Sequence, residues 1–576
     1  MKLTRTIHTL GVAFFLLVSF LLVGCGSDDK STVSNFMLTP GTDTTFNIGE
    51  ATVYFPGDSV KKEVIGSAEI LQNKSSLPEN IRAITDIYSL RLSDPDAYEP
   101  DNEGTITFSV PNPLKHAVYA SYKKYDIEAS NVWYRIGGTV GDGTIEAPIP
   151  KGVSQFVVAE EPPAGGLGAT TSDSHMRKGP YLILNGSPGS MTVQWQVSST
   201  SEAKATLFWG PKYYDDPNSY PYQAEVISDT KRFFSKQISD LPPGVRTYYV
   251  VSIIDTDTGK RWNYHGSFMT PLSDSATTLS FYAYGDTRSY PADHNRVLHY
   301  MLADSRANGL QDTRQTFLIH AGDFVARGLL DDSYSESDSH NKWDSEFFYY
   351  RKHVSTNEVL TMLPIMGVVG NHEHYYNDTS GRLHYTTPTK LYRYYWNYPQ
   401  YQTPDNNYYS FDYGPVHFVS LDVYSADYAQ GTAQYNWLVA DLKRSTKPWK
   451  IVMFHHPAYC ANTGGSDVGY ADTDKIRKNI SPILEDKATY GVNLVIQAHE
   501  HNYSRSRVNG MDYLMLGGGG AGLVDGDNPL PVWVQSFKKE YNFARIEIDG
   551  STMNVTVLNA NDNSYLETID FLTINK

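Results

Sequence analysis

The chain has 576 residues, of which 40% are hydrophobic, 19% charged and 13% aromatic. This length exceeds what one hydrophobic core accommodates, and the composition is that of a folded protein, so about three domains are expected. The net charge of −16 opposes binding to a phosphate backbone and disfavours a nucleic-acid partner. With only two cysteines, Cys25 and Cys460, a disulfide scaffold is excluded.

The N-terminus carries a targeting signal. Residues 1–24 combine basic residues with the apolar run Leu10–Val23, which is typical of a signal peptide. The run ends in Leu22-Val23-Gly24-Cys25, which resembles the lipobox of bacterial lipoproteins, where the cysteine becomes lipidated. This resemblance implies a lipid anchor at Cys25 and an extracytoplasmic, membrane-anchored protein. Gly26 in place of aspartate points to the outer membrane or cell surface if two membranes are present. An ordinary secretory signal is the alternative.

Two segments after the signal have the pattern of short β-strands. We expect residues 25–40 to form a tether and 41–160 to form a β-sandwich, with turn signals between alternating strands. The first sandwich resembles ZU5-like domains and has no cluster of catalytic residue types. A linker rich in Pro, Gly and Thr is predicted over 161–177, followed by a second β-sandwich over 178–272.

The third segment, residues 276–576, alternates short buried strands with helical stretches, which indicates a layered α/β domain. Helices are predicted over Asn295–Ala307 and Ala433–Lys443. The strands Ala544–Ile548 and Met553–Val557 are expected to close the domain. This segment also holds 13 of the 17 histidines, between positions 277 and 526. Any catalytic chemistry is therefore expected here.

Five motifs in this segment each follow a predicted strand, at the edge where chemistry is placed in α/β domains. They are Gly285-Asp286-Thr287-Arg288, Gly322-Asp323, Gly370-Asn371-His372-Glu373, His455-His456 and His499-Glu500-His501. Oxygen ligands together with imidazoles suit Zn, Fe or Mn. One metal needs about three or four such ligands, so six or seven predict a pair of metals that share one carboxylate.

The ordered motifs resemble those of the calcineurin-like metallophosphoesterases. Together with the segment 178–272, which is similar to a fibronectin type III module, they resemble the purple acid phosphatase branch. This resemblance implies a four-layer α-β-β-α sandwich with two metal ions. The implied ligands are Asp286, Asp323 and His501 for one metal, and Asp323, Asn371, His455 and His499 for the other. His372 is implied as a donor to the phosphate or the leaving-group oxygen, with Glu373 expected to orient it.

Several positions depart from the family pattern or have two interpretations. Ala326 stands where purple acid phosphatases have a tyrosine, so no charge-transfer colour is expected and the metal stays open among Fe, Zn and Mn. Arg288 stands where other members have a histidine ligand. Arg288 and Arg327 are candidate substrate-binding residues because guanidinium matches phosphate, with structural ion pairs as the alternative. His456 is a second candidate catalytic residue or a packed histidine. Ala498 replaces a usual glycine, which is acceptable unless the backbone there is left-handed.

Two other features also have a functional and a structural interpretation. The aromatic stretch Leu391–Tyr398 either lines the substrate cleft or packs a long insertion. The run Gly517–Gly520 either offers backbone N–H groups to an anion or forms a tight turn near the site.

The leading hypothesis is an extracytoplasmic, lipid-anchored phosphatase that hydrolyses small phosphomonoesters by attack of a metal-bound hydroxide. A phosphodiesterase or nucleotidase with the same metals is the alternative within this class, because loops select the leaving group. A surface-binding lipoprotein with a decayed catalytic domain is the alternative of another class, supported by Arg288 and Ala326. No feature predicts the oligomeric state or the role of residues 41–160.

Overall fold

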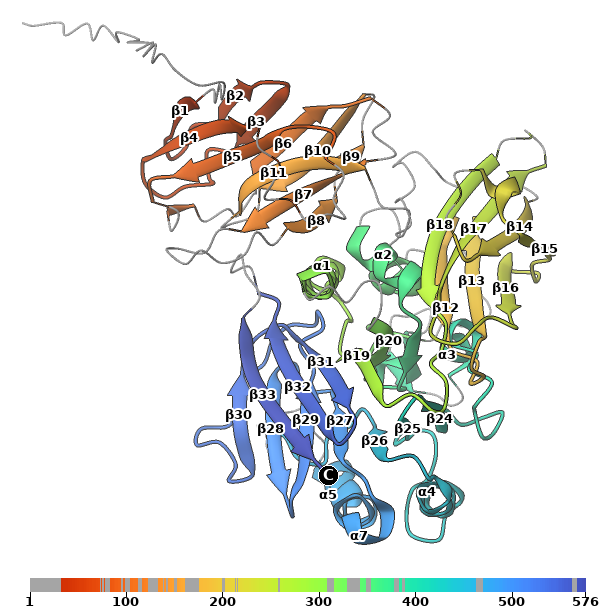
Figure 1. Ribbon diagram of the computed structural model, residues 1–576. Coiled ribbons are helices and arrows are strands. Elements are labelled where there is room, and N and C mark those ends of the chain that lie inside the picture. The colour runs from red at the N-terminus through yellow and green to blue at the C-terminus, as the bar shows by residue number, and fades with distance from the viewer. Residues whose placement is uncertain are drawn as a thin grey trace, which may run out of the picture.

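The computed structural model (Figure 1) describes residues 33–576 with short gaps. The gaps are residues 73, 75–76, 78–82, 95–96, 99–103, 112–115, 123–132, 138, 141–142, 150–152, 161–175, 199–202, 213, 215, 257–258, 260, 308–314, 329–341, 349–353, 378–382, 386–388, 463–469 and 562–566. The predicted signal peptide, Cys25 and most of the predicted linker lie outside the described residues. No helix in the described part is long and apolar enough to cross a bilayer.

The N-terminal domain, red to orange in Figure 1, is a sandwich of two antiparallel sheets with a hydrophobic core of its own. The six-stranded sheet has the order β1 (Val33–Leu38), β4 (Val64–Leu71), β5 (Ile87–Leu92), β11 (Val153–Glu160), β7 (His116–Tyr122) and β8 (Trp133–Gly137). The five-stranded sheet has the order β2 (Thr44–Ile48), β3 (Ala51–Phe55), β6 (Gly104–Ser109), β10 (Thr144–Ile149) and β9 (Thr139–Val140).

Strand β1 corrects the later part of the tether predicted over residues 25–40, and residues 25–32 lie outside the described residues. It pairs with β4, Leu38 is buried, and the Phe36 ring stacks on Phe46 with 4.5 Å between centroids. Alternating polar and apolar residues over so short a segment do not by themselves indicate a strand. Here pairing with β4, which is distant in the sequence, makes the segment a strand.

The second β module, yellow in Figure 1, is a smaller pair of antiparallel sheets. One sheet has the order β12 (Met176–Ile183), β13 (Met191–Val197) and β16 (Phe233–Ile238). The other has the order β15 (Tyr222–Val226), β14 (Ala203–Gly210), β17 (Arg246–Asp255) and β18 (Arg261–Met269), with η3 (Pro217–Ser219) before β15. Strand β12 begins at Met176, inside the segment predicted as a linker.

The C-terminal domain contains two larger mixed sheets. The six-stranded sheet has the order β21 (Ile365–Gly367), β20 (Gln315–His320), β19 (Thr278–Tyr284), β31 (Asn542–Asp549), β32 (Thr552–Asn559) and β33 (Thr568–Asn575). The seven-stranded sheet has the order β24 (Tyr409–Tyr413), β25 (Val416–Ser420), β26 (Trp449–Met453), β27 (Leu494–Gln497), β29 (Met511–Leu516), β28 (Tyr503–Val508) and β30 (Val534–Lys538). Strands β31 to β33 extend the first sheet, as expected of closing strands.

The remaining elements of this domain are mostly helices. They are α1 (Pro291–Ala307), η4 (Trp343–Phe347), α2 (Val354–Met362), η5 (His372–His374), α3 (Lys390–Tyr395), α4 (Ala433–Arg444), α5 (Tyr470–Asn479), α6 (Ser481–Glu485) and α7 (Lys487–Tyr490), with the hairpin β22 (Tyr375–Asn377) and β23 (Leu383–Tyr385).

Alternating side chains build the layers of this domain. Between the two sheets, Phe281 of β19 stacks on Phe317 of β20 and meets Phe418 of β25 edge-on, at 5.0 and 5.3 Å between centroids. The next residue along β25, Val419, instead joins the cluster formed with Leu438 of α4 and the other helices of that side. Strands covered on both faces in this way are apolar throughout. The predicted α-β-β-α sandwich is confirmed.

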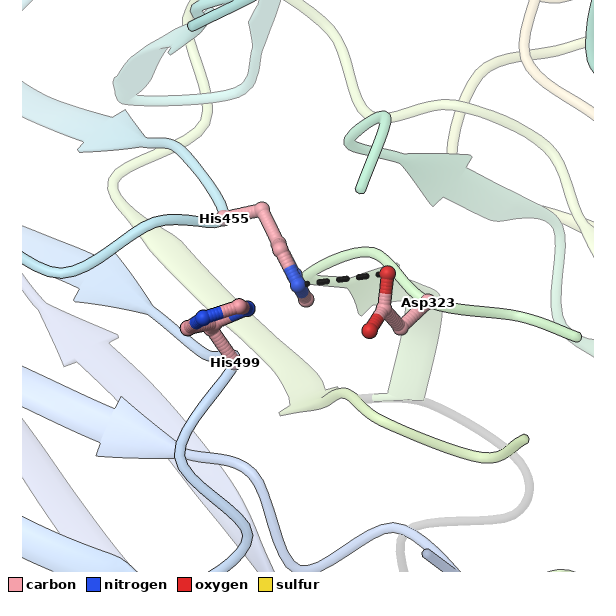
Figure 2. A group of neighbouring side chains, drawn as sticks. All are labelled: Asp323, His455 and His499. Atoms are coloured by element: carbon pink, nitrogen blue, oxygen red, sulfur yellow. Dashed lines mark ion pairs between the residues drawn. The ribbon is translucent and has the colours of Figure 1, made fainter. Parts of the chain in front are cut away.

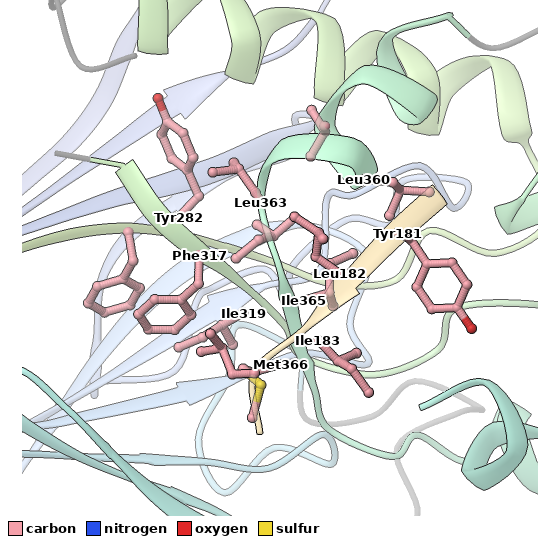
Figure 3. Packing of buried hydrophobic residues seen from close by; sticks show 14 of the residues in the cluster. Tyr181, Leu182, Ile183, Tyr282, Phe317, Ile319, Leu360, Leu363, Ile365 and Met366 are labelled. Carbon is pink, nitrogen blue, oxygen red and sulfur yellow. The ribbon is translucent and has the colours of Figure 1, made fainter. Parts of the chain in front are cut away.

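The second β module shares its core with the C-terminal domain. Tyr181, Leu182 and Ile183 of β12 pack beside Ile365 and Met366 of β21 (Figure 3). This continuity makes the module a structural part of the C-terminal domain.

The aromatic stretch Leu391–Tyr398 belongs to this shared core and does not line an open cleft. Tyr392, Tyr395, Trp396 and Tyr398 are buried, and the Tyr181 hydroxyl donates to Tyr395 O at 2.9 Å. The packing interpretation of the stretch is therefore the correct one.

Tyrosine hydroxyl groups complete the free edge of β21, the last strand of its sheet. Tyr398 Oη donates to Ile365 O at 2.9 Å and accepts from Gly367 N at 2.8 Å. Tyr392 Oη and Tyr409 Oη both donate to Gly367 O at 2.9 Å. Because buried backbone groups need partners, these hydroxyls replace a neighbouring strand and hold β21, from which the chain runs directly to Asn371.

Candidate metal centre

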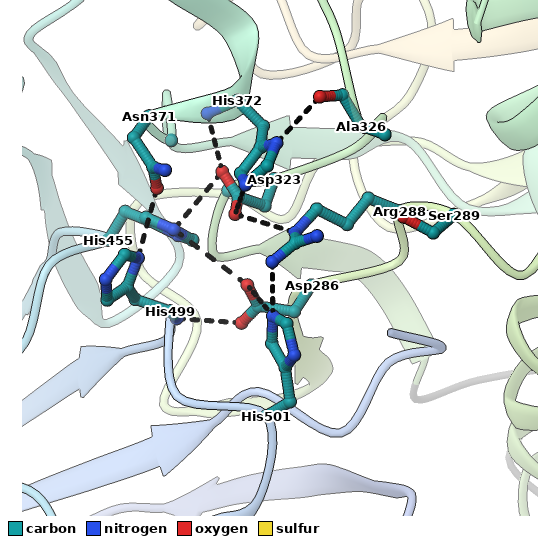
Figure 4. A network of polar contacts seen from close by, with 12 residues as sticks. Asp286, Arg288, Ser289, Asp323, Ala326, Asn371, His372, His455, His499 and His501 are labelled. Atoms are coloured by element: carbon teal, nitrogen blue, oxygen red, sulfur yellow. Dashed lines mark hydrogen bonds and ion pairs between the residues drawn. The ribbon is translucent and has the colours of Figure 1, made fainter. Parts of the chain in front are cut away.

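The five motifs meet at one edge of the two sheets, past the carboxyl ends of five strands (Figure 4). Asp286 follows β19, Asp323 follows β20, Asn371 follows β21, His455 follows β26, and His499 with His501 follow β27. Parallel strands deliver their carboxyl ends to a common edge, which explains why residues more than 200 positions apart become neighbours.

Two groups of buried side chains at this edge have ligand atoms within 4.8 Å of one another, and both contain Asp323. One is Asp323, His455 and His499 (Figure 2), and the other is Asp286, Asp323 and His501. A shared carboxylate between two sets of nitrogen and oxygen donors is the arrangement of a metal pair.

Backbone carbonyls set the direction of the imidazoles. Nδ1 of His455 contacts Ala321 O at 2.8 Å, Nδ1 of His501 contacts Gly522 O at 2.9 Å, and Nδ1 of His372 contacts Ala326 O at 2.7 Å. A carbonyl only accepts, so each Nδ1 carries the hydrogen and each Nε2 is directed into the site. Ligating histidines are oriented in this way in metal proteins.

Three ligand residues have left-handed backbone conformations, with φ of 59° at Asp286, 57° at Asp323 and 83° at His499. Residues other than glycine rarely adopt such values, and the strain persists only where the surroundings impose it. Here Asp286 N donates to Gly322 O at 3.0 Å and His499 N donates to Asp286 Oδ2 at 2.8 Å. Ala498 does not have a left-handed conformation, so alanine is accommodated there without strain.

Known families match this geometry. Residues 279–503 match the family model described as calcineurin-like phosphoesterase. The chain contains a calcineurin-like phosphoesterase domain. The chain is also 26% identical to human acid phosphatase type 7 over 413 residues, which covers 65% of this chain and 85% of that protein. It is 31% identical to purple acid phosphatase 18 of Arabidopsis thaliana over 183 residues, which covers 29% of this chain and 40% of that protein.

A solved structure extends the similarity of fold beyond the phosphoesterase domain. Purple acid phosphatase PPD1 from yellow lupin (Lupinus luteus) superposes with a TM-score of 0.52 at 14% identity, covering 95% of this chain and 96% of that chain. The predicted resemblance to the calcineurin-like family is confirmed for residues 279–503, and the similar proteins include acid and purple acid phosphatases. The protein is a metal-dependent hydrolase.

The electrostatics of the phosphoesterase site are those of buried carboxylates held by cations. Burial raises the pKa of Asp286 well above its usual value. Burial acts in the same direction on Asp323, but His455, His372 and Arg288 outweigh it and hold the pKa of Asp323 well below its usual value. Burial would lower the pKa of His455, yet Asp323 and Asp286 raise it to about 9. Burial thus dominates at Asp286, whereas neighbouring positive charge dominates at Asp323.

Several atoms of the candidate ligands are buried and make no hydrogen bond. Asp286 Oδ1, Asp323 Oδ2 and His455 Nε2 are buried without a hydrogen-bond partner. His455 Nε2 lies 3.3 Å from Asp323 Oδ1 and 3.9 Å from Asp286 Oδ1. Buried polar atoms are normally satisfied, so converging unsatisfied acceptors fit bound cations.

The two predicted substrate arginines have different surroundings. Arg288 Nε lies 3.3 Å from Asp323 Oδ2, and Arg288 Nη2 lies 3.1 Å from His501 Nε2. Arg327 is half-buried, and no hydrogen bond or ion pair connects its guanidinium with another of the described residues. The structure therefore brings Arg288 to the centre and gives no such contact for Arg327.

The two predicted catalytic histidines also differ. His372 N donates to Asp323 Oδ1 at 3.0 Å, and its Nε2 lies 3.8 Å from Asp323 Oδ2, so the ring faces the centre. His456 contacts Thr473 Oγ1 at 3.1 Å and Tyr424 Oη at 3.4 Å. Burial, followed by His499 and His455, lowers the pKa of His456 to about 2, which makes it a poor proton donor. The geometry favours His372.

Glu373 corrects a prediction, because its carboxylate does not orient His372. It accepts from three backbone N–H groups instead, those of Asp323 at 3.0 Å, Phe324 at 2.8 Å and Gly370 at 2.7 Å. Burial and the Asp323 carboxylate raise the pKa of Glu373 to about 8. Glu373 therefore positions the loop of the shared aspartate.

The sequence reasoning missed two residues at the site. Glu346 of η4 accepts from Ser289 N at 2.9 Å and from Ala326 N at 2.7 Å, which joins the first two motifs. Tyr424 Oη lies 3.4 Å from Asn371 Oδ1, beside the second group of ligands. Neither residue belongs to a motif, although Tyr424 shortly follows the buried strand β25, which is a usable signal.

The Gly517–Gly520 run packs closely against neighbouring backbone. Its Gly517 and Gly519 N–H groups donate to backbone carbonyls and are not directed at an anion. Gly519 N donates to Gly285 O at 2.8 Å, and Gly517 N donates to Asn502 O at 3.1 Å. A Cβ on Gly517 would lie 2.0 Å from Glu500 O and 2.9 Å from Asp286 Oδ2. The tight-turn interpretation is the one that the structure supports.

Proposed function

We propose that this protein is an extracytoplasmic, lipid-anchored phosphatase that hydrolyses phosphomonoesters. The observation that carries the proposal is the pair of buried ligand groups that share Asp323 at the edge of the phosphoesterase sheets. The names of the relatives, acid and purple acid phosphatases, favour a phosphatase within the wider phosphoesterase class.

The donor set fits two transition-metal ions of the Zn, Fe or Mn type. Asp286, Asp323 and His501 would hold one ion, and Asp323, Asn371, His455 and His499 would hold the other. When bound, the ions supply a nucleophilic water at neutral pH and neutralise charge on the phosphoryl oxygens. The alanine at position 326 offers no phenolate, which favours ions that do not need one.

Residues of the chain position the substrate and handle the proton. The guanidinium of Arg288 contacts both Asp323 and His501, so it would lie beside the phosphoryl oxygens of a substrate bound at the centre. His372 keeps its Nδ1 hydrogen on Ala326 O, so Nε2 is the atom that would carry a proton to the leaving oxygen. Burial lowers the pKa of free His372. A phosphate dianion next to Nε2 favours the protonated ring, so the donor becomes charged as the substrate binds.

The proposed location depends on the N-terminal segment. The apolar run that ends at Cys25 supports lipidation, which anchors a protein by burying acyl chains in a bilayer. Labelled fatty acid fed to expressing cells should enter the wild-type protein and not Cys25→Ser. Incorporation that survives this substitution, or is missing from the wild type, would refute the anchor while leaving the proposed chemistry intact.

The chemistry is tested by replacing the shared ligand. Asp323→Ala should lose bound metal, measured by elemental analysis, and should lose phosphomonoesterase activity by at least about a thousandfold. Asp405→Ala, an exposed aspartate outside the two ligand groups, is the matched control and should keep both. Undiminished activity of Asp323→Ala would refute the proposal.

The wild-type protein separates the alternative functions. Faster turnover of diesters than of monoesters would favour the phosphodiesterase alternative. Metal binding without any turnover would favour the decayed binding module.

A further inference from the structure

Arg288 makes the two halves of the metal centre unequal. Its guanidinium lies between Asp323 and His501, at 3.3 Å from Asp323 Oδ2 and 3.1 Å from His501 Nε2 (Figure 4). The side chain is only 18% exposed, so the charge lies inside the centre and not in bulk solvent. One half of the site thus already contains a positive charge supplied by the chain.

The atoms that Arg288 contacts are those that a cation in this half would need. His501 uses Nδ1 to donate to Gly522 O, so Nε2 holds its only free lone pair, and that lone pair faces Arg288 Nη2. A metal bound by Asp286, Asp323 and His501 would compete with the guanidinium for His501 Nε2 and Asp323 Oδ2.

In the other half, ligand atoms contact one another rather than Arg288. Asp323 Oδ1 faces His455 Nε2 at 3.3 Å, and His499 Nδ1 lies 3.0 Å from Asn371 Oδ1. The polar side-chain contacts of His455 and Asn371 within the described part of the chain are with Ala321, Asp286, Asp323, Tyr424 and His499, and none is with a lysine or arginine. Asp323 belongs to both halves, but its contact with Arg288 is through Oδ2, whereas Oδ1 on this side faces His455.

The backbone around Arg288 is held in place, so the side chain is not a loosely placed surface group. Thr287 N donates to Asp323 O at 3.1 Å and Thr287 Oγ1 donates to Phe324 O at 2.9 Å. On the other side, Ser289 has a φ of 75° and its N–H donates to Glu346 Oε2 at 2.9 Å. Thr287 is thus held by the Asp323 loop and Ser289 by Glu346. Because both neighbours are fixed, the backbone directs the Arg288 side chain toward the centre.

We propose that Arg288 is an internal competitor for metal, so that the two halves load unequally. The half formed by Asp323, Asn371, His455 and His499 binds metal tightly. The half formed by Asp286, Asp323 and His501 binds a second metal weakly, because the ion must displace or repel the guanidinium. This inference rests on the proposed metal-dependent function and adds which half limits the loading.

The test is a zinc titration of the chelator-treated full-length chain by calorimetry, with elemental analysis after desalting. The wild type should show one tight equivalent and a second that is at least about tenfold weaker, because like charges a few ångströms apart repel strongly. Arg288→Met, which keeps the length but not the charge, should tighten the second equivalent by at least about tenfold. Arg288→Gln is the second variant, in case methionine disturbs folding, and circular dichroism checks both.

Three further variants assign the steps. Arg327→Met removes a nearby positive charge that has no described contact with the ligands, and should leave both affinities unchanged. His455→Ala should remove the tight step, whereas His501→Ala should remove only the weak one.

Two wild-type equivalents of equal affinity, or an unchanged gap in both Arg288 variants, would overturn the inference while leaving the proposed phosphatase intact. A wild type that binds no zinc, iron or manganese would overturn the proposed function itself.

Discussion

Gly519 is a position where one added methyl group tests how the metal centre is held together. A Cβ at Gly519 would lie 2.2 Å from Gly285 O, 3.0 Å from Gly285 C and 3.1 Å from Thr287 Cγ2. Ordinary contacts of this kind need roughly 3.4 Å, so backbone on one side must shift by about 1 Å. Because Gly285 directly precedes Asp286, the shift moves a metal ligand.

The expected cost has two parts. Overpacking of a buried contact costs about 1–3 kcal/mol, and the hydrogen bond from Gly519 N to Gly285 O, 2.8 Å long, is weakened as well. A displacement of about 1 Å at a reacting site lowers the rate by about a hundredfold. Gly519→Ala should therefore lose about 1–3 kcal/mol of unfolding free energy in urea and about two orders of magnitude in kcat, with reduced metal retention.

The same loop provides the matched control. A Cβ at Gly522 would meet only Tyr290 Cε2, at 3.6 Å, which is an ordinary contact. The Gly522 carbonyl, which accepts from His501 Nδ1, is unchanged by a side chain. Gly522→Ala should stay within about 0.5 kcal/mol and a factor of three of the wild type. If Gly519→Ala behaves like Gly522→Ala, then close packing of the glycine run does not position Asp286 and the reasoning is wrong.

Three other changes test the proton donor, the edge of β21 and a histidine outside the site. His372→Asn should lower kcat for alkyl phosphates by about 10²–10⁴, and much less for aryl phosphates, because only poor leaving groups need a proton. Tyr398→Phe should cost about 1–3 kcal/mol in urea unfolding, because the Gly367 N–H is left without its acceptor. Burial would lower the pKa of His417, but hydrogen bonds to Asp412 and Asp441, at 2.6 and 2.9 Å, outweigh it and raise that pKa. His417→Gln should therefore lose stability relative to the wild type below about pH 6.5, and the difference should shrink as pH rises through the raised pKa.

Each of these has an outcome that contradicts it. For His372, equal losses on both classes of leaving group, or loss of metal, would point to a structural role. For Tyr398, the exposed Tyr222 is the control, and an equally small effect of both phenylalanine substitutions would mean that the hydroxyl does not hold β21. For His417, a stability difference that grows above pH 8 would have the wrong sign for a histidine stabilised in its protonated form.

The ordered motifs were predictable because chemistry at the ends of buried strands depends on local sequence. Asp286, Asp323, Asn371, His455, His499 and His501 each stand directly after an apolar run, and parallel strands bring such positions to one edge. The layered fold followed from the same runs, since strands covered on both faces are apolar throughout.

Other features depended on contacts between segments far apart in the chain. Strand β1 forms because β4 offers a partner edge, and the aromatic run Leu391–Tyr398 is buried because the second β module packs on it. Glu373 is adjacent to His372, yet its carboxylate turns to three amides of two other loops. No local pattern encodes these choices, because the competing partners of a side chain are known only when the chain is folded.

The sequence by itself determined which side chains can bind metal and at which edge of the sheets they gather, since strand periodicity and residue chemistry are local properties. Only the tertiary structure decided that Arg288 lies between Asp323 and His501, that the glycine run packs against Gly285, and that three ligands have left-handed backbones. These depend on distances of a few ångströms between separate loops. Such distances are set by packing of the whole domain and not by any one segment.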